Sequence, residues 1–445
     1  MNLTLKVVIG MGLGIVIGLF FNLSGLNADG SFVNTYIVDG AFHVIGKMFI
    51  NALKMLVVPL VFFSLICGVC GIGNLNTLGR VGSKSFALYM LTTAIAITVA
   101  MTIALTAGIG EGMNLAGTAS FTAKEAPPLT DVFINIIPSN PVKAMANGDM
   151  LPLIFFSILV GISMLMLGTK AKGFIEGAEI ANEIMMKMVN IIMAAAPYAV
   201  FVLIAKSMAN LGTELLGQLV GYVLVLVGAL FFHLFVTLML VLKFFSGLNP
   251  ILFLKKIRSA QVFAFSTASS NATIPVTLRA VTQRMGVNNS VASFTVPFGA
   301  TINMDGTAIM QGVATVFIAN IYSADLGTAE YITVILMSVL ASIGTAGVPG
   351  VGLIMLSMVF AQVGLPIEGI GLILGVDRLM DMIRTAVNVS GDAVVSTIVA
   401  KSESKFDLAT YNDLDAGVVL NDDLHVDPAV EKELAEAIQN TQNQS

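Results

Sequence analysis

Long apolar stretches with few or no charged side chains recur along the chain and restrict its fold more than any other feature. A helix needs roughly 20 apolar residues to cross a hydrocarbon core of about 30 Å. Residues are 56% hydrophobic and only 11% charged, against roughly 25% charged in soluble domains. The chain is therefore predicted to be an integral membrane protein. The first six candidate spans are Val7–Phe21, Phe42–Gly73, Ser85–Gly110, Met150–Thr169, Met188–Ala205 and Leu215–Leu242.

The uncharged stretch Ser259–Leu278 is long enough to span, but its composition is wrong for a lipid-facing helix. Its centre, residues 266–275, consists largely of serine, threonine and asparagine and ends in proline. Lys256 and Arg258 precede the stretch and Arg279 follows it. Because basic residues favour the cytoplasmic side, both ends are expected there. We therefore predict a re-entrant hairpin.

A second hairpin is predicted in the uncharged stretch Tyr331–Ile367. Its centre, Gly344–Gly352, is rich in glycine and contains a proline, and it leaves two arms of about 20 Å, too short to span. The nearest charges, on Asp325, Glu330 and Glu368, are acidic, which favours entry from the outer face. Two broken hairpins from opposite faces are typical of transporters with inverted repeats, whose site lies where the tips meet.

Two further spans complete a predicted all-α fold of eight transmembrane helices and two re-entrant hairpins. They are Met285–Asn320, interrupted at Asn303–Thr307, and Gly369–Ala400. Eight spans put both termini on one side, and most basic residues lie at predicted cytoplasmic ends. Residues 403–445 hold ten acidic and two basic residues, a net charge of −8. We expect them to form a disordered cytoplasmic tail.

Polar and charged residues follow one face of the last span. Successive members are four, three, four and four residues apart, which places them on one side of a helix. Each ionised group at mid-membrane costs at least about 2.5 kcal/mol, so these side chains need partners or ligands. We interpret the stripe as a binding site, with ion pairs that only fix helix packing as the alternative. Its members are Asp377, Asp381, Arg384, Asn388 and Asp392.

The interruption at Asn303–Thr307 is a second polar cluster at membrane depth. It combines a glycine and an acid with two further polar side chains, which indicates a broken helix. The freed carbonyls and side-chain oxygens suit a hard cation such as sodium, whereas a simple glycine kink is the alternative. Thr92 and Thr93 are weaker candidates, because threonines in membranes commonly bond to their own helix.

Other motifs exclude several classes of function. Cys67 and Cys70 have redox spacing but lie in an apolar run, so ordinary packing is expected. The three histidines are far apart in the sequence, and no phosphate loop, HExxH or GxSxG motif occurs. A net charge of −5 offers no basic surface for nucleic acid. We therefore expect neither an enzyme nor an ATP-driven pump.

Four motifs resemble one known family in sequence and in order. They are SSNATIP at Ser269–Pro275, NMDGT at Asn303–Thr307, SIGTAGVPG at Ser342–Gly350 and DMIRTAVNVSGD at Asp381–Asp392. Together they resemble the dicarboxylate/amino acid:cation symporter family, which includes archaeal aspartate transporters and mammalian excitatory amino acid transporters. The resemblance covers nearly all of residues 1–402. It implies a sodium-driven symporter of the cell inner membrane that takes up aspartate or glutamate.

The resemblance also implies a homotrimer with an elevator mechanism. A fixed scaffold would comprise approximately residues 1–79 and 130–210. A moving transport part would comprise approximately residues 83–111 and 214–402, and it would include hairpins at 249–284 and 327–367.

The implied substrate site uses residues of both hairpins and of the last two spans. Arg384 would bind the side-chain carboxylate, since a guanidinium pairs with a carboxylate through two parallel hydrogen bonds. Asp381 would meet the α-ammonium group. The remaining implied substrate residues are Asn388, Ser269 and Ser270 at the α-carboxylate, with Thr307, Val348, Gly352 and Thr385 around the pocket.

Sodium is the implied coupling ion, at three sites, and no other cofactor is expected. The implied ligands are Gly299, Asn303, Asn388 and Asp392 at the first site, Thr301, Ser342, Ile343 and Thr345 at the second, and Tyr89, Thr92, Thr93, Asn303 and Asp305 at the third.

The close alternatives are a proton-coupled glutamate carrier and a C4-dicarboxylate carrier, and an anion channel is an alternative of another class. One position departs from the family pattern. Some archaeal members have an arginine directly before the hairpin serines, where this chain has Ala268. We hypothesise that Arg378, three residues before Asp381, neutralises Asp381 or Asp377 when no substrate is bound.

Overall fold

The computed structural model of the protein describes residues 3–70, 78–112, 134, 136–345, 347 and 349–417. Within these ranges all regular elements are helices, and the isolated antiparallel bridge Val287–Phe406 is the only strand-like pairing. The predicted all-α class is confirmed. Five helical stretches are long and apolar enough to cross a membrane, namely Leu5–Leu23, Val33–Cys70, Arg80–Ala107, Pro152–Ala194 and Leu215–Ser246.

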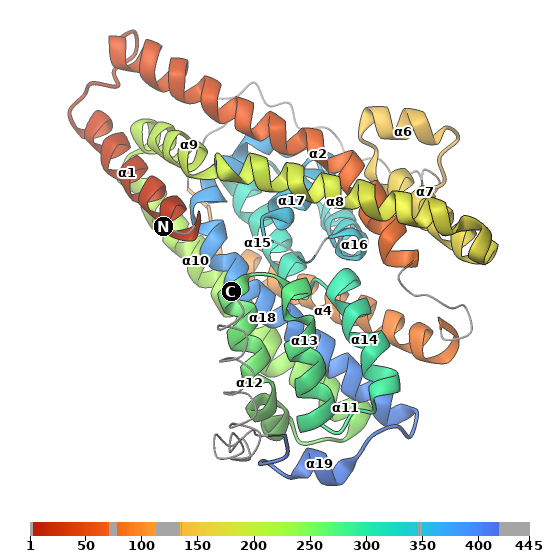
Figure 1. Ribbon diagram of the computed structural model, residues 1–445. Coiled ribbons are helices and arrows are strands. Elements are labelled where there is room, and N and C mark those ends of the chain that lie inside the picture. The colour runs from red at the N-terminus through yellow and green to blue at the C-terminus, as the bar shows by residue number, and fades with distance from the viewer. Residues whose placement is uncertain are drawn as a thin grey trace, which may run out of the picture.

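Helices from the first half of the chain form one end of the molecule, at the top of Figure 1. Helix α1 lies along α9 because glycines allow close approach. A Cβ atom at Gly10, Gly14 or Gly18 would lie only 2.4, 2.8 or 2.5 Å from a carbonyl oxygen of α9. The elements of this end are α1 (Leu3–Leu23), η1 (Val33–Phe42), α2 (His43–Cys70), α6 (Pro141–Asn147), α7 (Met150–Leu167), η3 (Gly168–Ala171), α8 (Lys172–Ala194) and α9 (Ala196–Leu211).

The structure divides one of the predicted spans. Met188–Ala205 is not a single helix, because α8 ends at Ala194 and α9 begins at Ala196. Pro197 stands in the first turn of α9, where its missing N–H leaves no helical hydrogen bond unmade. The break therefore follows from a proline that the count of uncharged residues ignored.

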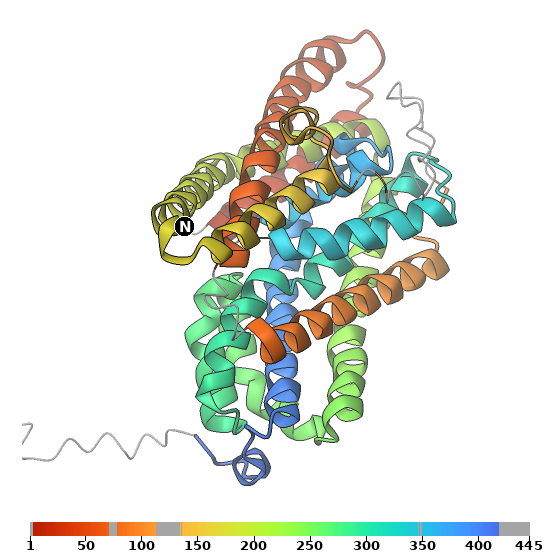
Figure 2. The same cartoon turned by 90° about the vertical axis from the view of Figure 1, so that its right-hand side faces the viewer.

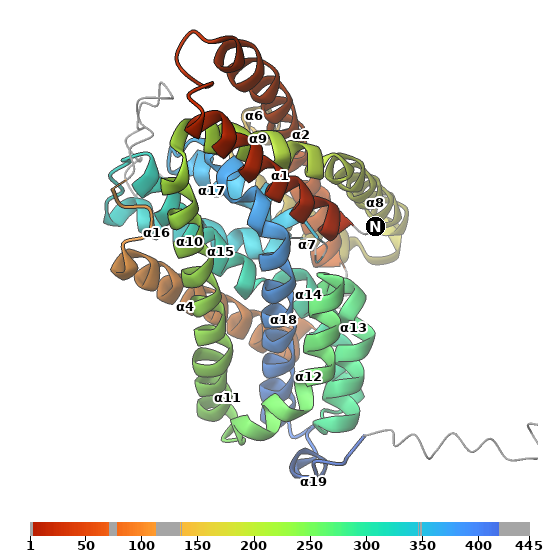
Figure 3. The same cartoon turned by 90° about the vertical axis from the view of Figure 1, so that its left-hand side faces the viewer.

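The second half of the chain is arranged around α18 (Ile370–Ser402), which has 33 residues and is about 50 Å long. Figure 3 shows α18 between α10 and α11 on one side and α12, α13 and α14 on the other. The helix α4 from earlier in the chain crosses this group, as Figure 2 shows in orange. These elements are η2 (Leu78–Gly82), α4 (Ser83–Ala107), α10 (Thr213–Phe232), η4 (His233–Thr237), α11 (Leu238–Ser246), α12 (Pro250–Thr267), α13 (Ser270–Arg279), η5 (Ala280–Arg284), α14 (Asn289–Ile302), α15 (Asp305–Ile321), α16 (Thr328–Gly344), α17 (Val351–Gln362) and η6 (Ile367–Gly369).

Each predicted hairpin region contains two consecutive short helices. Between α12 and α13 the chain turns at Ala268, whose φ of 49° lies in the left-handed region. Ser269 then caps α13, since its side chain accepts a hydrogen bond from the Ala272 N–H at 3.2 Å. Before α17 the chain turns at Gly350, whose φ of 86° favours glycine.

The predicted break in the span Met285–Asn320 is also confirmed. Helix α14 ends at Ile302, and α15 begins at Asp305. Asn303 and Met304 between them have extended or irregular backbone angles, with φ of −109° and −117°. The two helix ends bring unsatisfied backbone groups into the protein interior, where side chains must meet them.

The segment after α18 is not disordered throughout, contrary to prediction. Residues 403–417, here called the strap, pack against the ends of the surrounding helices and contain the short helix α19 (Leu408–Asn412). Lys256 of α12 is fully buried and its Nζ donates hydrogen bonds of 2.6 Å to the carbonyl oxygens of Thr410 and Asp413. Tyr411 is also fully buried, and its hydroxyl donates to the carbonyl of Asn249 at 2.9 Å.

Acidic residues of the strap have specific partners, which the composition of the tail does not predict. Glu403 forms ion pairs of 2.6 Å with Arg80 of η2 and with Lys84 in the first turn of α4. The backbone N–H of Asp407 donates to the carbonyl of Gly286 at 2.7 Å. The expected disorder is therefore wrong for residues 403–417, and residues 418–445 lie outside the described part of the chain.

We predict that Lys256→Met lowers the thermal midpoint of the purified protein. The change leaves the carbonyl oxygens of Thr410 and Asp413 without their buried donor, at a cost of about 1–3 kcal/mol for each group left unsatisfied. Lys255→Met is the matched control, because Lys255 is exposed on the same helix. Thermal unfolding in detergent measures both, and equal midpoints for the two variants would contradict the prediction.

Candidate functional site

The turns of the two helix pairs contact each other, as the sequence predicted. The Ser269 hydroxyl donates to the carbonyl of Gly347 at 2.8 Å, and the Asn271 N–H donates to the same oxygen at 3.1 Å. A Cβ atom at Gly347 would lie 2.8 Å from the carbonyl oxygen of Ala300. The junction of the two turns thus rests on the end of α14, one turn before the break. Ser270 is buried beside it.

Arg384 is fully buried, and only part of its guanidinium is satisfied. Its Nη2 donates to a carboxylate oxygen of Asp377 at 2.8 Å and of Asp381 at 3.1 Å. The Nε and Nη1 atoms are buried without a hydrogen-bond partner. Since buried donors are normally paired, these N–H groups can donate to a ligand that carries hydrogen-bond acceptors.

Gly352 and Thr307 lie beside Nη1 of Arg384. A Cβ atom at Gly352 would lie 2.9 Å from Nη1 of Arg384 and 3.3 Å from the Thr307 methyl carbon. Glycine at this position therefore leaves Nη1 accessible. The structure brings these three predicted substrate residues together from α15, α17 and α18.

Asp381 connects α18 to the turn before α17. Its Oδ2 accepts a hydrogen bond from the Gly350 N–H at 3.3 Å, and it lies 3.7 Å from Nη1 of Arg378. The hypothesised contact of Arg378 with Asp381 is thus present. Thr385 instead donates its hydroxyl to the backbone carbonyl of Asp381 at 2.7 Å. With Asp377, the group contains two carboxylates and two guanidinium groups.

Asn388 binds the break between α14 and α15. Its Oδ1 accepts from the Gly306 N–H at 2.7 Å, and its Nδ2 donates to the sulfur of Met304 at 3.2 Å. Ser342 of α16 acts similarly, because its hydroxyl donates to the Ile302 carbonyl at 2.8 Å and accepts from the Met304 N–H at 2.9 Å. Asn388 and Ser342 therefore both bind the backbone at the break, from α18 and from α16.

Asp305 is fully buried and receives hydrogen bonds from two directions. Its Oδ1 accepts from the hydroxyl of Thr93 at 2.6 Å and from that of Thr92 at 3.4 Å. Its Oδ2 lies 3.0 Å from Nε2 of His233, which is also buried. Thr92 and Thr93 also bond to the carbonyl of Tyr89, as the threonine alternative predicts, and their role as cation ligands stays a prediction.

Asn303 and Asp392 form a second oxygen-rich group beside Asp305. Asn303 Nδ2 donates to Asp392 Oδ1 at 2.9 Å, while Asn303 Oδ1 is buried without a partner. A Cβ atom at Gly299 would lie 2.5 Å from Asp392 Oδ1 and 2.6 Å from the Tyr89 hydroxyl. A hard cation takes oxygen ligands, so the unpaired Asn303 oxygen and the neighbouring carboxylates fit sodium.

The second predicted sodium site is brought together only in part. Ser342, Ile343 and Thr345 are buried at the end of α16, and the Thr345 hydroxyl donates to the Ala341 carbonyl at 2.7 Å. Thr301 instead lines a separate cavity of about 230 Å³ with Asn271 and Gly347. Val348 lies outside the described residues.

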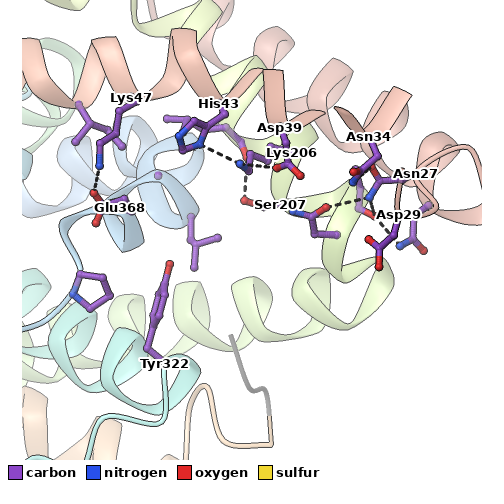
Figure 4. A pocket seen from close by; sticks show the side chains of 18 of the residues that line it. Asn27, Asp29, Asn34, Asp39, His43, Lys47, Lys206, Ser207, Tyr322 and Glu368 are labelled. Atoms are coloured by element: carbon purple, nitrogen blue, oxygen red, sulfur yellow. Dashed lines mark hydrogen bonds and ion pairs between the residues drawn. The ribbon is translucent and has the colours of Figure 1, made fainter. Parts of the chain in front are cut away.

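A large cavity among the described residues lies elsewhere. It measures about 1200 Å³ and separates the first-half helices from the end of α15 and the beginning of α18, as Figure 4 shows from close by. Lys206 forms an ion pair with Asp39 at 2.9 Å, and Lys47 of α2 pairs with Glu368 of η6. None of the predicted site residues lines it.

Comparisons with known proteins identify the family. A model of the sodium:dicarboxylate symporter family matches residues 3–402. The chain belongs to this family. It is 34% identical to the proton/sodium-glutamate symport protein of Geobacillus stearothermophilus, over 91% of this chain and 95% of that protein. It is 33% identical to the proton/glutamate-aspartate symporter of Escherichia coli K12, over 91% and 94%.

A C4-dicarboxylate transport protein of Bacillus subtilis is similar as well, at 31% identity over 92% of this chain and 95% of that protein. Membership of the sodium:dicarboxylate symporter family makes the chain a membrane transporter. The resemblance recognised in the motifs is confirmed. The names of the relatives differ in both the cation and the substrate.

Two residues in this symporter's polar interior were not among the predicted substrate or sodium ligands. Asp377 was noticed as part of the stripe, but its hydrogen bond to Arg384 depends on the guanidinium folding back along α18. The spacing of the histidines predicted no ligand set that includes His233, because no other histidine is near it in the sequence. His233 nevertheless contacts Asp305. Its position in the apolar stretch Leu215–Leu242 was the available signal, since a buried imidazole needs a polar partner.

We predict that Gly306→Ala destabilises the protein. Its Cβ would lie 2.7 Å from the carbonyl oxygen and 2.9 Å from the Cα of Arg384, so α15 and α18 would have to separate. Overpacking of this kind costs about 1–3 kcal/mol. Gly228→Ala in α10 is the control, because a Cβ there meets nothing within 4 Å. Thermal melts of both purified variants test this, and an unchanged midpoint for Gly306→Ala would contradict the packing argument.

Proposed function

We propose that this protein is a secondary active symporter that couples sodium entry to uptake of an acidic amino acid. The observation that carries the proposal is the unpaired Nη1 group of the buried Arg384, next to the carboxylate of Asp381. A charged guanidinium N–H without a buried partner can form a charge-assisted hydrogen bond with a side-chain carboxylate. Asp381 supplies an anionic partner for an α-ammonium group.

Asp381 is also the residue that favours an amino acid over a C4-dicarboxylate. A dicarboxylate has no ammonium group, and its second carboxylate would be repelled by Asp381. The alternative substrate class is nevertheless represented among the relatives, one of which is named a C4-dicarboxylate transport protein. Competition of succinate with labelled aspartate distinguishes the two.

Sodium is the proposed coupling ion because the polar interior is built from hard oxygen donors. Asp305, Asp392 and the unpaired Oδ1 of Asn303 lie beside a helix break, whose carbonyl groups add further oxygens. A bound cation would offset the charge of the carboxylates, so substrate and cation would favour each other's binding. A proton-coupled carrier is the alternative that the names of two relatives support.

The proposed mechanism moves one part of the protein against the other. The first-half helices would form the scaffold, and α4 with α10–α18 would carry the site across the membrane as an elevator with eight spans and two re-entrant hairpins. The cavity of about 1200 Å³ between the two parts leaves room for such a displacement.

Exposed apolar side chains on α8 support the proposed homotrimer, because they need lipid or another subunit as a cover. Both termini would be cytoplasmic in the cell inner membrane, since basic residues gather at those helix ends. The exposed residues of α8 are Phe174, Ile180, Ile184 and Ile191.

The substrate assignment is tested with a charge-balanced pair of substitutions. Arg384→Gln alone would leave Asp377 without its partner, so it is combined with Asp377→Asn. Loss of a charge-assisted pair at a desolvated site costs about 2–5 kcal/mol, so uptake of labelled aspartate by proteoliposomes should fall by at least about 30-fold.

Arg258→Gln is the control for this pair, because Arg258 is exposed on α12. A thermal melt establishes that the double variant is folded. Aspartate uptake retained at the wild-type level by a folded double variant would contradict the role of Arg384.

The sodium assignment predicts that Asp392→Asn weakens sodium activation of aspartate uptake while the protein remains folded. Gly299→Ala is an independent variant with the same expected direction, because its Cβ would lie 2.5 Å from Asp392 Oδ1 and would obstruct the site. Sodium titrations of uptake measure both. Equal uptake driven by a proton gradient in sodium-free buffer would contradict sodium coupling.

A further inference from the structure

The side chain of His233 is buried in an unusual backbone setting. It opens the π-helical turn η4 (His233–Thr237), which joins α10 to α11. Figure 3 shows α10 and α11 nearly in line, so the turn interrupts what would otherwise be one long helix. The imidazole is 1% exposed. Single π-helical turns occur frequently at functional sites, where they redirect a side chain.

The contact of His233 divides the two oxygens of Asp305 between different partners. Nε2 of His233 lies 3.0 Å from Oδ2, whereas Oδ1 faces the hydroxyl groups of Thr93 and Thr92. Because Oδ2 is a carboxylate oxygen, Nε2 carries the hydrogen and donates it. His233 therefore holds the Asp305 carboxylate from the η4 side, and the other oxygen, Oδ1, faces α4.

The second ring nitrogen of His233, Nδ1, argues against a role in packing alone. Nδ1 is buried without a hydrogen-bond partner, so the imidazole makes one polar contact only. A histidine retained for packing alone would be replaceable by an apolar residue without this unpaired atom. The contact with Asp305 is thus the interaction that distinguishes His233 from the apolar residues of α10 and α11.

We propose that His233 is a positioning residue for the coupling cation. By donating to Oδ2, it fixes Asp305 so that Oδ1 and the hydroxyl oxygens of Thr92 and Thr93 face the cation together. Residues that hydrogen-bond a ligating group orient it and raise cation affinity. This role rests on the proposed sodium coupling, and His233 itself contributes no ligand atom.

The test compares three substitutions at one position. His233→Leu removes the donor and keeps an apolar bulk, whereas His233→Gln places an amide N–H close to the position of Nε2. His233→Asn keeps the amide but is too short to reach Asp305. Thr237→Val, at the other end of the same π-helical turn, is the control.

The first readout is the sodium dependence of the thermal midpoint of purified protein, with choline chloride as the ionic control. The second is aspartate binding at saturating sodium. For His233→Leu and His233→Asn, the sodium concentration for half-maximal stabilisation should rise on the order of 10- to 100-fold. His233→Gln should recover most of that loss. Aspartate affinity at saturating sodium should stay near the wild-type value in all folded variants.

The inference is overturned if sodium stabilises the wild-type protein but His233→Leu or His233→Asn has the wild-type sodium midpoint. It is also overturned if Gln and Asn lose sodium affinity equally, since that result assigns His233 a packing role. If His233→Leu does not fold, the Gln and Asn pair decides. Absence of any sodium effect on the wild-type protein would refute the proposed sodium coupling itself, and the role of His233 with it.

Discussion

A guanidinium without access to water must be neutralised by its neighbours, and the burial of Arg384 imposes this condition on the protein interior. Asp377 and Asp381 satisfy it through Nη2, and Arg378 adds a second cation near Asp381. The group is therefore balanced in charge before any ligand arrives. Balance of charge is not complete hydrogen bonding, however, because Nε and Nη1 remain unpaired. A ligand with a carboxylate can supply what the protein leaves out.

The fold holds this group in place through the broken helix. Asn388 and Ser342 bind the backbone at the break, so α16, α18 and the helices α14 and α15 meet at Met304 and Gly306. The absence of side chains at Gly306 and Gly352 permits this approach. Asp305 begins α15 at the same place and connects the break to α4 and to η4. The two proposed sites therefore share backbone, which gives cation and substrate a physical route for coupling.

Sequence patterns predicted these features where the physics is local. A polar break at Asn303 and a stripe repeating every three or four residues are visible in the sequence because membrane-spanning segments make polar residues rare. The glycine and proline turns predicted the helix pairs for the same reason. The elevator, the trimer and the orientation of the termini remain predictions.

Features that depend on partners far away in the sequence could not be predicted from local patterns. The contact of His233 with Asp305 joins residues 72 positions apart, and no periodic pattern records it. The acidic composition of the strap predicted disorder. Glu403 nevertheless binds Arg80 and Lys84, which lie more than 300 residues away in the sequence. The break between α8 and α9 follows from Pro197, which a count of uncharged residues does not detect. Asp377 was placed on the correct face, but its partner depends on the rotamer of Arg384.

The central claim is that the unpaired Nη1 group of Arg384 is where the substrate's carboxylate binds. A cryo-electron microscopy map of the protein with saturating aspartate and sodium tests it most directly. We expect density for the aspartate side-chain carboxylate within hydrogen-bond distance of Nη1 of Arg384, beside Gly352, with the α-ammonium at Asp381. Aspartate density elsewhere, with Nη1 still unpaired, would contradict the account.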